Sequence, residues 1–174
     1  VTLFVMPESV TLSDQEHYDL HNAALAQASK LQDRFAIIDV KQSSVLDANT
    51  ATDAATMRAS VVGDLKYGAS YYPYVRSSIA RSYDESSIMV TMPREEGEES
   101  AQVRFLSELD GTSTAHYNAV KALLRSHYLI LPPSAAVVGC IAKTDAARGV
   151  WKAPANVALT QVVKPMVAID NDQQ

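Results

Sequence analysis

The sequence has little cysteine and little glycine, and these shortages exclude several common kinds of site. Its 174 residues include one cysteine and six glycines. The single cysteine, Cys140, cannot form an intrachain disulfide and leaves no CxxC pair for metal binding or redox chemistry. The glycines are spaced neither as GxGxxG nor as GxxxxGK followed by Ser or Thr, so both phosphate-binding fingerprints are missing.

Long hydrophobic runs and basic clusters are missing as well. No apolar run approaches the roughly 20 residues that a membrane-spanning helix needs. The 15 lysines and arginines are scattered and the formal net charge is −5, so the sequence lacks the basic footprint of most nucleic-acid-binding proteins. Hydrophobic residues make up 47% and charged residues 20%, close to the globular average. We therefore expect a folded protein with no nucleic acid partner and no membrane insertion.

The first part of the chain alternates β-type and helix-type patterns. Strands are expected at 2–6, 35–40 and 69–72. Helices are expected near 13–33, 53–65, 114–127 and 134–148. Ser13 and Glu16 form a capping-box pattern at the start of the first helix. Because a helix returns the chain between parallel strands, this order predicts an α/β fold with a layered sheet, a parallel β-α-β-α-β start and C-terminal helices.

The middle of the chain has a different pattern. Strand-like runs at 87–92 and 102–106 flank a polar break in which 95–99 carries four glutamates. This pattern predicts a hairpin-like excursion over about 76–111 from a single α/β domain that spans 1–174.

Two pairs of polar residues stand at helical spacing and are candidate sites. His17 and His21 are four residues apart and could face one metal ion, but Tyr18 stands where the zincin pattern needs Glu, and no third ligand is evident. The pattern favours surface histidines on a helix. Asp145 and Arg148 are expected to form a local ion pair. We expect no catalytic, cofactor-binding or metal-ligating residues.

Two segments carry a specific family resemblance. Residues 68–75 read GASYYPYV, and 131–156 read LPPSAAVVGCIAKTDAARGVWKAPAN. Both resemble segments of the contractile tail-sheath proteins of phages and related injection machines, and the second resembles that family's long signature over 26 contiguous positions. A weaker similarity continues over 157–169. Cys140 stands where the family usually has an aliphatic or small residue, and Lys143 where Arg is common.

The signature indicates structure rather than chemistry. Gly139, among alanines, is expected to let another element approach the helix closely, and Gly149 suits a helix C-cap. Trp151 is expected to anchor the segment that leaves the helix. The residues expected to carry structure or contacts are Tyr71, Tyr72, Pro73, Pro132, Pro133, Ser134, Gly139, Asp145, Arg148, Gly149, Trp151, Lys152, Pro154 and Asn156.

The resemblance implies a structural subunit that is not an enzyme and needs no cofactor. In the family, such subunits stack as six-fold rings into a helical sleeve around an inner tube, and contraction of the sleeve drives the tube into a target cell. The implied partners are other sheath subunits, the tube and the baseplate. The implied location is the bacterial cytoplasm during assembly and then the tail or injection-machine sheath.

The resemblance also implies that the chain is an internal fragment of a longer subunit. In the family a tube-facing C-terminal domain follows the Lys-Ala-Pro-Ala-Asn region, and terminal arms add strands to neighbouring subunits. We expect that domain and arm to be missing here, and the fragment alone to be monomeric, or at most a weak dimer, at micromolar concentration.

Two other interpretations stay open at this point. An α/β nucleotide-binding or hydrolytic domain would share the β-α-β-α-β start, although the phosphate motifs are missing. A sheath component of a type VI-like or phage-like bacterial injection system would share the mechanism and differ in setting. Neighbouring genes for a tube, a baseplate, a capsid or a dedicated ATPase would separate the phage, prophage and bacterial settings.

Overall fold

The computed structural model describes residues 2–92 and 102–170. The chain forms two compact units, which we call unit 1 (Val1–Ser78 with Ile130–Gln174) and unit 2 (Ile79–Leu129). Unit 2 begins close to the start of the predicted excursion but continues beyond 111, because its second helix packs with the element before it. The glutamate-rich break at 95–99 and the last four residues lie outside the described residues.

A three-stranded parallel sheet forms the centre of unit 1. It is ordered β1 (Thr2–Val5), β2 (Arg34–Asp39) and β3 (Gly68–Tyr71), with β2 in the middle. The register places Val5 beside Ile37 and Ile37 beside Ala69. The α/β fold and the parallel β-α-β-α-β start predicted from the sequence are confirmed.

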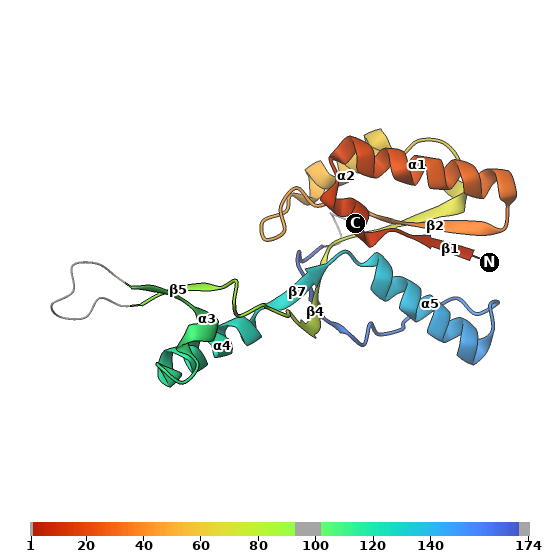
Figure 1. Ribbon diagram of the computed structural model, residues 1–174. Coiled ribbons are helices and arrows are strands. Elements are labelled where there is room, and N and C mark those ends of the chain that lie inside the picture. Colours follow the sequence, from red (N-terminus) through yellow and green to blue (C-terminus); the bar gives the residue numbers. More distant parts are fainter. Residues whose placement is uncertain (1, 93–101, 171–174) are drawn as a thin grey trace. The chain divides into compact units, whose positions relative to one another are not determined.

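Two helices cover one face of this sheet in unit 1 (Figure 1), and their bounds follow from their caps. α1 (Asp14–Leu31) begins at the predicted capping box, in which the Ser13 hydroxyl accepts from the Glu16 N–H. α2 (Thr50–Ser60) starts earlier than predicted because the Asn49 side chain caps it by accepting from the Thr52 N–H. It also ends earlier, and Gly63 with φ +77° follows it.

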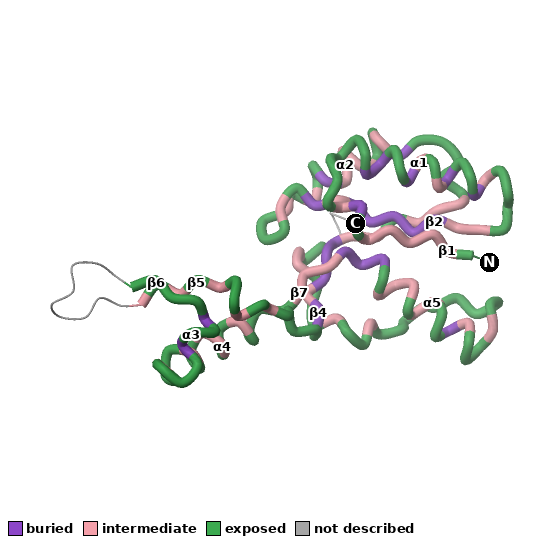
Figure 2. Tube along the Cα trace, in the orientation of Figure 1, coloured by how far each residue is buried: buried purple, intermediate pink, exposed green. Residues whose placement is uncertain are grey.

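The main core lies between these helices and the sheet. Tyr18 and Leu25 of α1 pack with Ala36 and Ile38 of β2 and with Val61. Because side chains alternate along a strand, Ile37 and Asp39 point to the opposite face. Figure 2 shows that buried residues follow β2 and recur along α1.

α5 (Ser134–Arg148) packs against β1 and β2 and lies on the face opposite α1 (Figure 1). Its bounds match the prediction, and it ends at Gly149, whose φ of +87° is one that glycine adopts readily. Two 3-10 turns, η1 (Pro7–Thr11) and η2 (Leu65–Tyr67), complete this α/β layer.

A second sheet is ordered β7 (Tyr128–Leu131), β4 (Val75–Ala80) and β8 (Val162–Pro165). β4 and β8 are antiparallel, with a bulge between Arg76 and Ser77. β8 thereby fastens the segment that follows α5.

Unit 2 contains an antiparallel strand pair and two helices. β5 (Met89–Thr91) pairs with β6 (Val103–Phe105), as expected of a hairpin, and α3 (Leu106–Leu109) and α4 (Thr114–Ser126) follow. Glu85 joins α4 through Lys121 Nζ at 2.6 Å and the Tyr117 hydroxyl at 2.9 Å. In the described residues, no helix combines the length and hydrophobicity of a membrane span.

Candidate functional site

Unit 1 contains a set of buried polar side chains where η1, α1, β2 and α5 meet. We call Ser9, His17, His21, Asp39 and Ser134 the buried polar junction. The last four have no exposed surface, and Ser9 is 5% exposed. Groups this deeply buried destabilise a fold unless they are hydrogen-bonded, so each partner matters.

The strongest contact in the junction joins the end of β2 to the start of α5. The Ser134 N–H donates to Asp39 Oδ1 at 2.8 Å, and the Ser134 hydroxyl donates to Asp39 Oδ2 at 2.5 Å. The carboxylate also faces the positive end of the α5 dipole. Burial raises the pKa of Asp39, and the two hydrogen bonds from Ser134 oppose that rise.

The Pro-Pro-Ser motif explains how this contact is built. Pro132 and Pro133 are buried ahead of α5. Pro133 has φ −73°, a value the ring fixes and the helix needs, and proline has no N–H to leave unpaired there. The first helical N–H is then that of Ser134, which points to Asp39. All three motif residues were predicted to be structural, whereas Asp39 was missed.

The hydrogen bonds define the state of both imidazoles. His17 Nε2 lies 2.9 Å from the Asp39 carbonyl oxygen, an acceptor, so Nε2 carries the proton. The Ser9 hydroxyl donates to the Met6 carbonyl at 2.6 Å, so His21 Nε2, at 3.4 Å, donates to Ser9 Oγ. Neither Nδ1 atom has a hydrogen-bond partner among the residues that the structure describes. The two rings meet edge to face, with centroids 4.6 Å apart.

The interpretation of these histidines as surface residues is wrong. Both have no exposed area, because α1 turns them toward η1 and the end of β2. The pKa of His21 is lowered to about 4, mainly by burial and to a smaller extent by the neighbouring His17. Within residues 2–92 and 102–170, no three His, Cys, Asp or Glu residues are grouped so that they could hold a metal ion.

Ser134, Asp39 and His17 are the residue types of a nucleophilic triad, but their geometry differs from one. In a triad the serine donates to the imidazole and the imidazole donates to the carboxylate. Here the Ser134 hydroxyl donates to the carboxylate, and His17 donates to a backbone carbonyl. Ser134 is also fully buried, out of reach of a substrate. The arrangement can hold elements together, and it does not activate a nucleophile.

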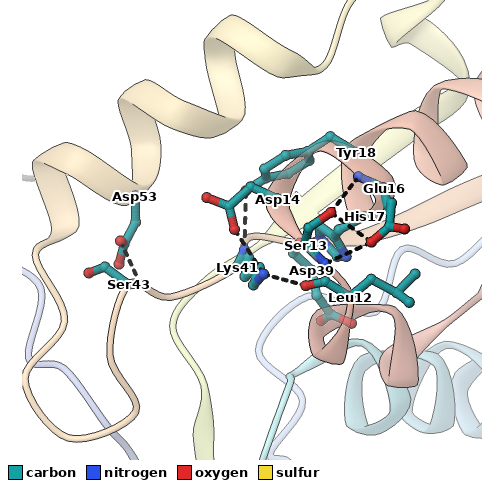
Figure 3. A network of polar contacts seen from close by, with 10 residues as sticks. All are labelled: Leu12, Ser13, Asp14, Glu16, His17, Tyr18, Asp39, Lys41, Ser43 and Asp53. Atoms are coloured by element: carbon teal, nitrogen blue, oxygen red, sulfur yellow. Dashed lines mark hydrogen bonds and ion pairs between the residues drawn. The ribbon is translucent and has the colours of Figure 1, made fainter.

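Further polar contacts fasten the loop after β2, as Figure 3 shows. Lys41 Nζ lies 2.8 Å from Asp14 Oδ1, and the Lys41 N–H donates to the Tyr18 hydroxyl at 3.2 Å. Asp53 of α2 accepts from the Ser43 N–H at 2.9 Å.

The predicted aromatic segment lies beside this loop. The Tyr72 hydroxyl donates to Asp53 Oδ2 at 3.1 Å, and the Tyr71 carbonyl accepts from the Val40 N–H at 3.0 Å. Pro73 is buried and follows a cis peptide bond. The segment thus holds α2 and β3 to the end of β2, and its two tyrosines are half-buried.

Gly139 and the end of the signature, from Val150 on, are exposed, contrary to two expectations. A Cβ added at Gly139 would meet nothing within 4 Å, so close packing at this glycine is wrong for the chain by itself. Trp151 is 85% exposed and Val150 76%, so Trp151 is not a buried anchor. Its ring instead lies against Gly149, where a Cβ would approach it to 2.3 Å.

The remaining signature residues are also on the surface or near it. Among the described residues, no ion pair joins Asp145 to Arg148, so that prediction is wrong; the Asp145 carbonyl accepts from the Gly149 N–H at 2.9 Å. Lys152, Pro154 and Asn156 are exposed.

A cavity of about 410 Å³ lies between the second half of α5 and this exit segment. We call it the basic groove. It is lined by Lys143, Thr144, Ala147, Arg148, Lys152, Ala153, Ala155 and Val157. None of its three cations forms an ion pair with any part of the chain that the structure describes.

No protein-family model matches the chain, and no curated protein matches it. The tail-sheath resemblance therefore rests on the residues of 68–75 and 131–156.

Proposed function

We propose that this chain is part of a structural subunit of a contractile tail sheath, and that it has no catalytic activity. The observation that carries the proposal is the 26-residue signature at 131–156. In this chain the signature has two physical roles. Its first residues lock α5 to the central sheet, and its last residues expose an apolar and basic surface.

The signature has a buried start and an exposed end, and this combination supports a protein that assembles with other subunits. The buried Asp39–Ser134 contact makes α5 a fixed part of unit 1. Val150 and Trp151 are large apolar side chains that the fold leaves in solvent. Tryptophan is enriched among the residues that dominate protein–protein interfaces, so a partner surface accounts for its exposure.

An α/β enzyme is the competing function. The parallel sheet offers the carboxyl strand ends where such enzymes bind ligands. At that edge, however, the Asp39 carboxylate accepts a hydrogen bond from Ser134, and the Tyr72 hydroxyl donates one to Asp53. Asp39 and Ser134 are buried and hydrogen-bonded to each other, and the half-buried Tyr72 is hydrogen-bonded to the buried Asp53, which supports the structural function.

Immunogold electron microscopy tests the proposal. An antibody against this chain would be applied to particles released from the producing bacterium. We expect gold along the sleeves of contractile particles, in extended and contracted forms alike, and on neither capsids nor bare tubes. Unlabelled sleeves in a preparation where the antibody detects the chain elsewhere would contradict it. The labelled particle would also separate a phage tail from a type VI-like sheath.

A further inference from the structure

The basic groove has the chemistry of a binding site for an acidic polypeptide segment. Three cations, Lys143, Arg148 and Lys152, line it together with alanines, Thr144 and Val157, and no acidic residue lines it. The remainder of the chain is acidic, since the formal net charge is −5 in spite of these cations. Guanidinium and ammonium groups pair with carboxylates, and a bidentate pair also fixes orientation.

A polypeptide fits the groove better than a nucleic acid does. The lining holds no aromatic side chain on which a base could stack, and a chain of net negative charge repels a long polyanion. Small apolar side chains let an extended backbone approach closely while the cations reach its carboxylates.

The sequence itself contains a segment of the required charge. Residues 95–99 carry Glu95, Glu96, Glu98 and Glu99, the densest group of carboxylates in the chain. We infer that this acidic run of one copy binds the basic groove of a second copy. The groove and the run are different parts of the sequence, so the contact is heterologous and repeats from copy to copy, as rings and helical sleeves require. This inference rests on the proposed function and specifies one of its subunit contacts.

The sole tryptophan provides a local reporter, because Trp151 is exposed and directly precedes Lys152 of the groove. The receptor would carry glutamine at all four positions of its own acidic run, which leaves its groove free. A synthetic peptide of residues 92–102 would be titrated into it at low salt while Trp151 fluorescence is recorded. We expect a saturable change that weakens as salt is raised, and no change with a peptide whose four glutamates are glutamines.

Matched receptor variants locate the binding site. Replacing Lys143, Arg148 and Lys152 by glutamine should weaken peptide binding more than tenfold. The control replaces two exposed lysines and an exposed arginine elsewhere in unit 1, with Lys30→Gln, Arg58→Gln and Lys66→Gln. It has the same net charge and should bind like the parent receptor. No saturable binding, equal losses in both variants, or equal quenching by an oligonucleotide would overturn the inference.

Cross-linking decides whether the partner is a second copy. In a Cys140→Ser background, one sample carries Glu98→Cys and another carries Lys152→Cys. Mixing and oxidising them should give a disulfide-linked dimer of the two different variants. A chain that carries both cysteines and closes only on itself when dilute would contradict the inference. If the cross-link fails to form but the antibody still labels sleeves, only this inference is contradicted. If the antibody leaves the sleeves unlabelled, the proposed function is contradicted.

Discussion

At the scale of single residues, Ser134 has the largest structural role in the signature. Its N–H and hydroxyl both bind Asp39, although the two residues are 95 positions apart in the sequence. A contact between the end of one strand and the start of a distant helix fixes the relative position of both. The buried carboxylate needs this partner, because an unpaired buried acceptor costs more than a hydrogen bond gains.

Replacing Ser134 by alanine should therefore destabilise unit 1 strongly. The variant loses a hydrogen bond to a buried charged group and should lower the free energy of unfolding by about 1.5–3 kcal/mol. Urea denaturation followed by circular dichroism measures this. Ser70→Ala, at an exposed serine of β3, is the matched control and should stay within about 0.5 kcal/mol of the parent. A Ser134→Ala variant as stable as the control would show that Asp39 does not need the hydroxyl.

His21 should make the fold sensitive to acid. Its pKa is about 4 when folded and 6.5 ordinarily, so the unfolded chain binds more protons between these values. Stability from this group is fully present above pH 6.5 and is lost as the pH falls toward 4. At 1.36 kcal/mol per pKa unit, the loss approaches about 3 kcal/mol.

The raised pKa of Asp39 has the opposite effect, because it favours the folded state as the pH falls. The contribution of His21 to the pH dependence is therefore best isolated with a variant. His21→Gln cannot titrate in this window. Urea denaturation at pH 7.5, 6 and 5 should show a steeper loss of stability in the parent than in His21→Gln. Parallel pH dependences would contradict the assignment.

At the scale of elements, the sequence predicted what depends on neighbours along the chain. The capping box at Ser13, the glycine cap at Gly149 and the apolar runs of the strands are local signals, and all three appear as expected. The predicted range of α2 starts too late in the sequence, because the prediction did not include the cap at Asn49. The order of β-type and helix-type segments was enough to predict the parallel sheet.

The candidate site was less predictable because it depends on contacts between distant segments. An aspartate inside the apolar run that forms β2 is a signal for a buried carboxylate, but nothing local indicates its partner Ser134. The burial of His17 and His21 follows from how η1 folds over α1, which helical spacing does not show. Gly139 and Trp151 were assigned to packing within the chain, and the fold leaves both exposed.

The exposed position of Gly139 in α5 leaves room for a side chain. A Cβ there meets open space, and alanine is a better helix former than glycine. Gly139→Ala should raise the free energy of unfolding by about 0.5–1 kcal/mol. Thermal and urea denaturation of the chain measure this. A destabilised variant would mean that another element packs against Gly139 in solution.

At the scale of the whole molecule, the chain alone should be monomeric at micromolar concentration. Stable interfaces bury roughly 1,200–2,000 Å². The basic groove is a small, charged contact that becomes strong only when many copies repeat it. Light scattering coupled to gel filtration should give the mass of one chain, 18.9 kDa. Stable rings or tubes formed by this chain would show that it already contains the contacts that hold a sheath together.

The most direct test of the sheath function is a helical reconstruction of contractile sleeves purified from the bacterium that produces this chain. We expect six subunits per ring, density that matches unit 1, and Trp151 covered by a neighbouring subunit. Sleeves in which Trp151 stays in solvent would contradict the interface assignment. Sleeves built from a different protein, with this chain absent by mass spectrometry, would contradict the sheath function itself.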